Sequence, residues 1–452
     1  MNRDEAKKLY VLAINEIEIV PNDFFVFDLP AIEEDEAGKL IYKIYFSPTK
    51  KAVFSSSCKS KFDEVSKWLL KSEKVHNKYS LDDVILIVMK EAINHVGNSD
   101  VIIIESFTKL RDRLQEQIPP LLTIVPVKGI TTKKIFKIEN VVIGMLSEEL
   151  ETLIDSTSND YGSPYFKFTD DVVWTEDYLH WKNSYDEEDE IDISDLPILF
   201  SVWTHQHGYK STERIHEYID LFASTISYLK FKEITSGYIA PDFLTINDYC
   251  EIYQNKNHEY GYDSKQFLVH SPLKKINKSE LFQMRESFLN MDDLTKDDLS
   301  FIGRMFRTLE GDAKSWEIRF ARFLHWFHVG NKGINISNSM VSYSIALESL
   351  LNPERVPDSV TNTIAERVSY LNESASAEER IKIFKNIKKV YDKRSRVTHG
   401  QEIMSYDMDE IIIKEMVQLL FDISQNFLIC AKEQDWKEDA DMDRFFELKK
   451  FS

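Results

Sequence analysis

The sequence is poor in cysteine, in long apolar runs and in basic charge. Its 452 residues contain three cysteines, Cys58, Cys250 and Cys430, which lie far apart and form no CxxC pair. A disulfide framework or a zinc ribbon is therefore not expected. No apolar run approaches the roughly 18 to 20 residues of a membrane-spanning helix, and residues 1–20 lack the continuous apolar core of a signal peptide. We expect a cytoplasmic protein that does not engage a membrane.

The shortage of basic charge limits how the chain could bind nucleic acid. It has 76 Asp and Glu against 56 Lys and Arg, a formal net charge of −20. Its overall field opposes non-specific coating of nucleic acid, so any RNA contact must come from a local basic patch. One exists: residues 380–396 carry eight Lys and Arg and one Asp, which gives 8 − 1 = +7.

What the sequence does contain is ample apolar material, 43% of residues, and a length that predicts two or three domains. We predict a mixed α+β amino-terminal domain over 1–185, with a sensor or regulatory role of unknown kind. An acidic linker and mixed connecting region is expected over 186–297, which includes the run DEEDEIDISD. An all-α bundle is expected over 298–452. The fold class is therefore multidomain, a mixed α+β region followed by a helical bundle.

Local patterns give the expected elements of the first two regions. A hairpin is expected from 39–47 and 50–56, because two β-branched and aromatic runs flank a short turn. Further strands are expected at 84–89, 100–105, 121–127 and 134–143. Helical spacing predicts helices over 62–72, 106–117 and 211–231.

The bundle is expected to contain about six helices, and the basic segment 380–396 forms one of them. Its apolar residues recur at three- and four-residue steps and predict a face docked into the bundle; they are Ile383, Phe384, Ile387, Val390 and Tyr391. Continuing that phase brings Arg394 to the inward edge. An arginine there needs an anionic partner, either a carboxylate such as Glu348 or Glu366, or a phosphate.

His399 follows Arg394 by five residues and directly precedes Gly400, where the helix is expected to end. The unpaired carbonyls of a helix end favour a cationic imidazole. A histidine can move a proton on or off the 2′-hydroxyl or the 5′ leaving oxygen of RNA. An arginine can fork onto the phosphate oxygens as negative charge grows. Alternatively, Arg394 forms an inward salt bridge and His399 is only a helix-end cap.

The string Arg394-Ser-Arg-Val-Thr-His399 fits the Rx4H form of the Rx4–6H signature of HEPN ribonucleases. With SIALESLL and AERVSYL upstream, residues 300–435 resemble the Apea-like branch of that superfamily. The resemblance implies a metal-independent endoribonuclease whose site is composed across a homodimer, often in toxin or antiphage-defence systems that cause abortive infection. The residue after the arginine, often Asn, Asp or His elsewhere in the superfamily, is Ser395 here.

The candidate catalytic residues are thus Arg394 and His399, and no cofactor or metal is expected. Auxiliary roles are assigned to Ser395, Glu348 and Tyr391. Glu348 either orients Arg394 or is a helix-surface charge, and Tyr391 either belongs to the core or stacks on a base. The expected RNA-binding residues are Lys385, Lys388, Lys389, Lys393 and Arg396.

The expected partners are RNA, with tRNA or another structured RNA among the candidates, a second copy of the chain, and an unknown trigger sensed by the amino-terminal region. The apolar stripe of the helix at 408–433 is a candidate for part of the contact between copies. A different function class is a non-catalytic HEPN module for RNA or nucleotide binding or dimerisation.

Two other histidine groups offer alternative sites. His205, His207 and His216 could begin the site of a metal hydrolase, because alternate residues of a strand face one way. His325 and His328 share a helix side with Arg322, which is either the border of an RNA groove or an ordinary polar face.

Overall fold

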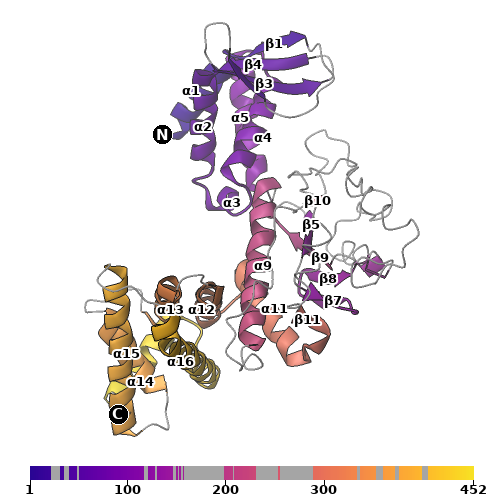
Figure 1. Ribbon diagram of the computed structural model, residues 1–452. Coiled ribbons are helices and arrows are strands. Elements are labelled where there is room, and N and C mark those ends of the chain that lie inside the picture. The colour runs from indigo at the N-terminus through magenta and orange to yellow at the C-terminus, as the bar shows by residue number, and fades with distance from the viewer. Residues whose placement is uncertain are drawn as a thin grey trace.

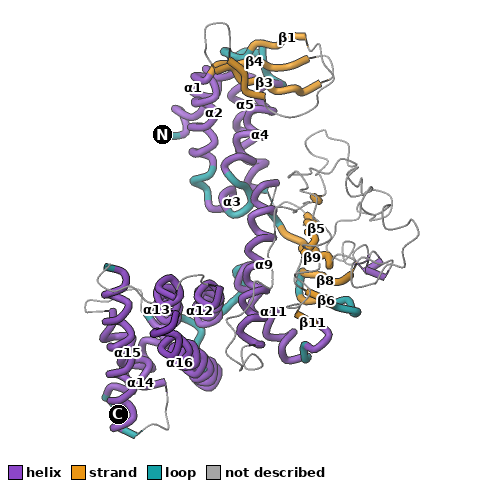
Figure 2. Tube along the Cα trace, in the orientation of Figure 1, coloured by secondary structure: helices purple, strands orange, loops and turns teal. Residues whose placement is uncertain are grey.

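The computed structural model describes residues 1–21, 31–34, 40–47, 50–116, 121–127, 130–145, 149–150, 152–153, 156, 198–206, 208–230, 253–254, 289–332, 336–352, 360–371, 376–399 and 406–451. Within these ranges the chain is mostly helical, with 13 helices and three small sheets. The strands gather at one end of the amino-terminal part and beside α9 (Figure 2). None of the helices in these ranges has the length and apolar character needed to cross a membrane.

The amino-terminal part packs helices beside a four-stranded antiparallel sheet. The helices are α1 (Arg3–Ile14), α2 (Ser56–Leu69), α3 (Glu73–His76), α4 (Leu81–Ile93) and α5 (Asp100–Gln115). The strands are β1 (Glu18–Pro21), β2 (Ala31–Glu34), β3 (Leu40–Ser47) and β4 (Lys50–Ser55), in the order β1-β4-β3-β2. The antiparallel pairing of β3 with β4 confirms the predicted hairpin, and α2 and α5 confirm helices at 62–72 and 106–117.

The strands predicted at 84–89 and 100–105 are wrong, because both runs lie in helices, α4 and the start of α5. A capping box begins α4: Ser80 Oγ accepts from the Asp83 N–H, and the Asp83 carboxylate accepts from the Ser80 N–H. Val84, Ile87 and Val88 are then all buried. A short apolar run buried on several sides has no polar face, so periodicity cannot distinguish it from a buried strand.

The middle of the chain forms a five-stranded sheet with a long helix beside it. Its strands are β5 (Leu121–Val127), β7 (Phe136–Ile138), β8 (Val141–Met145), β9 (Ile198–Thr204) and β10 (Tyr253–Gln254), in the order β10-β5-β9-β8-β7. A second, two-stranded sheet pairs β6 (Ile130–Thr131) with β11 (Leu289–Asn290) in parallel. The predictions at 121–127, 134–143 and 211–231 are confirmed by β5, the β7–β8 hairpin and α9 (Gly208–Lys230).

The carboxy-terminal part consists of helices, as predicted. They are α11 (Lys296–Glu310), α12 (Ser315–Lys332), α13 (Ile336–Leu351), α14 (Val360–Leu371), α15 (Ala377–Thr398), α16 (Tyr406–Glu433) and α17 (Asp439–Lys450). The last of these was not expected. Gly330 lets α12 and α13 approach closely, because a Cβ at that position would lie 2.3 Å from the Tyr343 ring.

Apart from Ile429, the described apolar residues of α16 from Met416 to Cys430 pack into the chain's own core, so these residues are not available to a second copy, contrary to expectation. The α16 residues Met416, Leu420, Ile423, Phe427 and Cys430 are all nearly inaccessible. Phe427 packs edge-on to Trp436, and Phe421 lies 5.1 Å from the Tyr228 ring of α9. Among the described α16 side chains, Ile429 is the exposed large apolar one.

Buried apolar residues form two clusters in the described ranges. One draws on residues from Ala6 to Leu114, and the other on residues from Ile130 to Phe446. The second cluster includes β9 and α9, which lie within the predicted connecting region, so that part is packed structure. α9 runs from the amino-terminal part towards the carboxy-terminal helices (Figure 1), and the Lys210 N–H donates to Asp83 at the junction. The division of function at residues 185 and 297 stays a prediction.

Candidate active site

The basic helix α15 lies at the outer side of the bundle, where one of its faces packs on α13 and α14 (Figure 1). A capping box between Ser376 and Glu379 begins it. Ile387 and Tyr391 are buried, and Ile383, Phe384 and Val390 pack against the same core. The predicted inward face is confirmed.

The basic residues of α15 divide into two groups. The exposed ones are Lys382, Lys385, Lys389 and Arg396. Lys388 and Lys393 are half-buried, and the Lys388 ammonium lies 5.7 Å from the centre of the Phe384 ring. Of the five expected RNA-binding residues, the three that face solvent are therefore Lys385, Lys389 and Arg396.

Arg394 lies on the inward edge of α15, as its phase predicted, with 31% of its side chain exposed. Its Nη1 is 3.4 Å from Glu348 Oε1 of α13, and its guanidinium carbon is 5.9 Å from the Tyr391 ring centre. Neither Arg394 Nε nor Glu348 Oε1 has a hydrogen-bond partner, although both atoms are buried. The contact is an ion pair without hydrogen-bond geometry. Glu366, the other expected partner, pairs with Lys450 at 3.0 Å.

Tyr391 is a core residue, only 4% exposed, so it offers no surface for stacking on a base. Its hydroxyl donates to the Ser344 carbonyl oxygen at 3.4 Å. Burial, and after it the negative charge of Glu348, raise the pKa of Tyr391 above its usual value. The phenol therefore stays protonated at neutral pH and fixes the wall beside Glu348 and Arg394.

His399 ends α15 as its C-cap residue, and its backbone N–H donates to the Ser395 carbonyl oxygen at 3.0 Å. Both side chains are exposed. The imidazole therefore lies near the negative end of the helix and is accessible from solvent. This placement agrees with the helix end predicted before Gly400, which itself lies outside the described residues.

Arg394 and His399 lie on different sides of α15. α15 is continuous through Thr398, so the two positions are separated by about 140° around the axis and about 7.5 Å along it. Arg394 faces Glu348 on the inside, whereas His399 faces solvent. Beside His399, the described residues Lys389, Asp392, Ser395 and Arg396 line an open depression of about 450 Å³.

Two other arginines of the bundle show what a structural arginine looks like here. Arg319 donates from Nε and Nη2 to Asp439 at 2.7 and 2.8 Å and from Nη1 to the Asn352 carbonyl at 2.7 Å. Arg367 donates to Asp443 at 2.6 Å and to the Leu351 carbonyl at 3.1 Å.

Both acceptor carboxylates of these arginines belong to α17, the helix that sequence reasoning missed. Its buried residues Met442, Phe445 and Phe446 recur at three- and one-residue steps. This spacing on an amphipathic segment is the signal that could have revealed the helix.

The described members of the two rival histidine groups do not assemble into one site. His205 is exposed and His216 is half-buried on α9, where burial lowers the pKa of His216; the side chain of His207 lies outside the described residues. No group of three or more potential metal ligands occurs among the described side chains. On α12, Arg322 and His325 are exposed. His328, in contrast, is buried, and its Nδ1 lies 2.8 Å from Ser227 Oγ, so the three do not form one surface.

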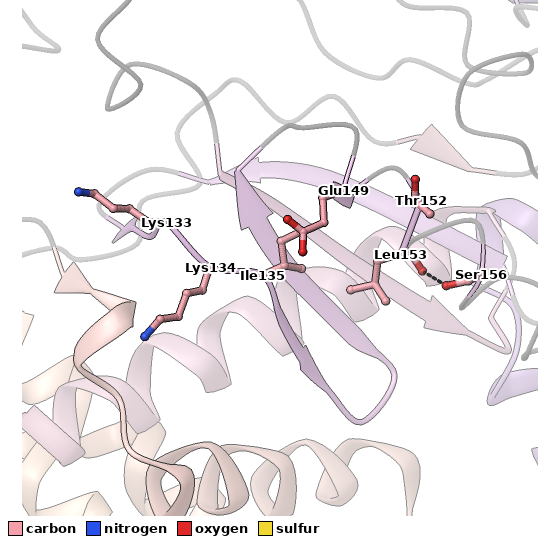
Figure 3. Close-up of a pocket in the computed structure, with 7 residues that line it drawn as sticks. All are labelled: Lys133, Lys134, Ile135, Glu149, Thr152, Leu153 and Ser156. Carbon is pink, nitrogen blue, oxygen red and sulfur yellow. Dashed lines mark hydrogen bonds between the residues drawn. The ribbon is translucent and has the colours of Figure 1, made fainter.

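The cysteines and a second pocket add no reactive cluster. Cys58 and Cys430 are buried free thiols, and burial raises the pKa of Cys58 to about 12; Cys250 lies outside the described residues. A pocket of about 850 Å³ beside the sheet is lined by Lys133, Lys134, Ile135, Glu149, Thr152, Leu153 and Ser156. Both lysine side chains point away from Glu149 (Figure 3).

No protein-family model matches this chain, and neither do curated proteins or solved structures.

Proposed function

We propose that this chain is a metal-independent endoribonuclease of the HEPN type, with Arg394 and His399 as its catalytic residues. The observation that carries the proposal is the incomplete pairing of Arg394. Its side chain is 31% exposed, it makes one 3.4 Å ion pair, and its Nε is unpaired. The buried Nε is not distinctive, because the Nε atoms of Arg214 and Arg380 are also unpaired; the proposal rests on the exposed part of the guanidinium, whose one ion pair is long. A phosphate is the anion that a planar fork of donors suits.

The chemistry assigned to this pair is transesterification within the RNA. The 2′ oxygen attacks the neighbouring phosphorus, the bond from phosphorus to the 5′ oxygen breaks, and a 2′,3′-cyclic phosphate and a 5′-hydroxyl result. His399 moves a proton at one of these two oxygens. The free donors of Arg394 stabilise the charge that grows on the phosphate oxygens. Glu348 of α13 and the buried Tyr391 of α15 border the guanidinium and hold it in place.

Arg394 and His399 diverge on one helix, so they need not converge on one phosphate within a single copy. We place the Arg394–His399 pairs of both copies in one cleft of a two-fold dimer, as the HEPN resemblance implies. A folded, strictly monomeric variant should then be inactive. Full RNase activity in such a monomer would contradict the shared site.

The amino-terminal part is proposed to control this activity, in the manner of a toxin or antiphage-defence effector. α9 supports this idea physically. Its Lys210 N–H meets Asp83 of the amino-terminal part, and its Tyr228 hydroxyl lies 2.7 Å from Ser424 Oγ in α16. One helix thus contacts both buried cores.

The second candidate is a non-catalytic HEPN module that binds RNA or mediates dimerisation. The Arg394–Glu348 ion pair and the position of His399 at the helix end favour it, because both residues then have structural roles. RNA cleavage by the purified protein is expected of the first candidate and not of the second.

The direct test is end-mapping of RNA incubated with the purified full-length protein in EDTA. We expect cleavage in single-stranded or loop segments, intact DNA, and products that carry 2′,3′-cyclic phosphate and 5′-hydroxyl ends. An internal 2′-hydroxyl is the nucleophile, so chelation should leave the rate unchanged. Activity that disappears in EDTA and returns with Mg²⁺ would refute this mechanism.

A further inference from the structure

We propose that the exposed side of α15 binds a single RNA strand and that Asp392 is a specificity-determining residue, which selects a base with an amino group, guanine above all, beside the cleaved bond. This inference rests on the proposed function and names the substrate feature that the same site would read.

The first observation is a line of cations along the helix. Lys382, Lys385, Lys389 and Arg396 are all exposed. Their spacing of three, four and seven residues keeps them within about 60° of the helix circumference, over about 21 Å of its length. In a chain of net charge −20, this line is complementary to a row of phosphates.

The second observation is a line of an acidic, a hydroxyl and an imidazole side chain that runs beside the line of cations. Asp392, Ser395 and His399 are exposed at spacings of three and four residues, so they follow one another on the same helix side. Asp392 and His399 are two turns apart, about 10.5 Å along the axis and only about 20° around it. A base held at Asp392 would therefore lie near a phosphate that reacts at His399.

The third observation is the depression between these lines. Lys389, Asp392, Ser395 and Arg396 line it, and its volume is about 450 Å³. Asp392 makes no hydrogen bond or ion pair with another residue in the described part of the chain. The hollow is thus lined by two cations, a hydroxyl and a carboxylate acceptor, a combination that suits a nucleotide better than a bare phosphate.

The acceptor character of Asp392 determines which base fits. An ionised carboxylate accepts hydrogen bonds and donates none. Guanine presents two neighbouring N–H donors on its Watson–Crick edge and can meet both carboxylate oxygens, while cytosine and adenine present one amino group. Uracil places carbonyl oxygens on both sides of its single N–H, and these repel the carboxylate.

A single strand is the form of RNA that this surface admits. The Watson–Crick edge of a base is available only when the base is unpaired and turned outward. Side chains cannot read the deep, narrow major groove of an RNA duplex. The inference therefore agrees with cleavage in loops and single strands.

Binding measured on the full-length His399→Ala protein tests the inference without destroying the RNA. The probes are labelled ten-nucleotide uridine strands with one central guanosine, cytidine or adenosine, and the all-uridine strand. We expect the guanosine strand to bind about tenfold more tightly than the all-uridine strand. Asp392→Asn, which replaces one acceptor oxygen by a donor, should abolish this preference.

Glu378→Gln is the matched control, because it removes one negative charge from the same exposed side of α15 near its other end. It should raise the affinity for every strand and keep the guanosine preference. A preference that survives Asp392→Asn, or equal affinity for all strands in the parent protein, would overturn the inference. Cleavage by the unmodified protein is scored separately, so lack of base preference leaves the proposed function standing.

Discussion

Two regions of the helical bundle bring arginine and carboxylate together in different ways. At the α17 contact, Arg319 and Arg367 are about nine-tenths buried and use several donors each, on α17 carboxylates and on main-chain carbonyls. At α15, Arg394 is three times more exposed and makes one long ion pair to Glu348. The first arrangement joins α17 to the rest of the bundle through hydrogen bonds. In the second, the Arg394 guanidinium keeps N–H donors for a ligand. The proposed function assigns the catalytic role to Arg394, which of these three arginines uses the fewest donors on protein partners.

The largest effect is expected from breaking the α17 contact. Arg319→Ala removes two donated bonds to Asp439 and one to the Asn352 carbonyl, while Ser315 still donates to Asp439. Because Asp439 is 31% exposed, we expect a loss of about 2 to 3 kcal/mol, below the roughly 3 to 5 kcal/mol of a fully buried pair. Urea denaturation followed by circular dichroism should show this loss in the free energy of unfolding. A loss no greater than that of Arg394→Ala would break the distinction between the two regions.

A smaller effect is expected from Glu348→Gln, which keeps the side chain's shape and removes its charge. If Glu348 positions Arg394, kcat should fall about tenfold to a hundredfold with KM nearly unchanged, because misplacement of a catalytic group costs rate. Glu366→Gln is the control, since Glu366 pairs with Lys450 away from the site. Equal kinetics for both variants would make Glu348 a purely structural partner.

The smallest effect concerns the exposed cations of α15. We replace Lys382, Lys385 and Lys389 with Gln. The slope of log binding constant against log salt concentration should then become shallower by about two, since each single-strand phosphate contact contributes roughly 0.7. Lys388→Gln should change the slope little, because its ammonium lies over Phe384. An unchanged slope in the triple variant would place the RNA elsewhere, for instance along Arg322 and His325.

Periodicity predicted the inward face of α15 and the position of Arg394, and Gly400 predicted the helix end at His399, because each depends on local sequence alone. Periodicity could not choose between Glu348 and Glu366, since the choice depends on how α13 and α14 pack against α15. It misassigned residues 84–89 because a fully buried helix and a buried strand can share one apolar run. The sequence also did not show that Lys389 is exposed while Lys388 is half-buried with its ammonium near the Phe384 ring, because this depends on the positions of the side chains.

The central claim, that Arg394 is catalytic and not structural, is tested most directly by measuring single-turnover RNA cleavage and unfolding free energy together on Arg394→Ala. We predict a rate about a hundred- to a thousandfold lower, with an unfolding free energy within about 1 kcal/mol of the parent, because the ion pair is partly exposed. His399→Ala should lose a comparable rate through proton transfer. Full activity in both alanine variants, or a rate loss that merely follows loss of folding, would contradict the account.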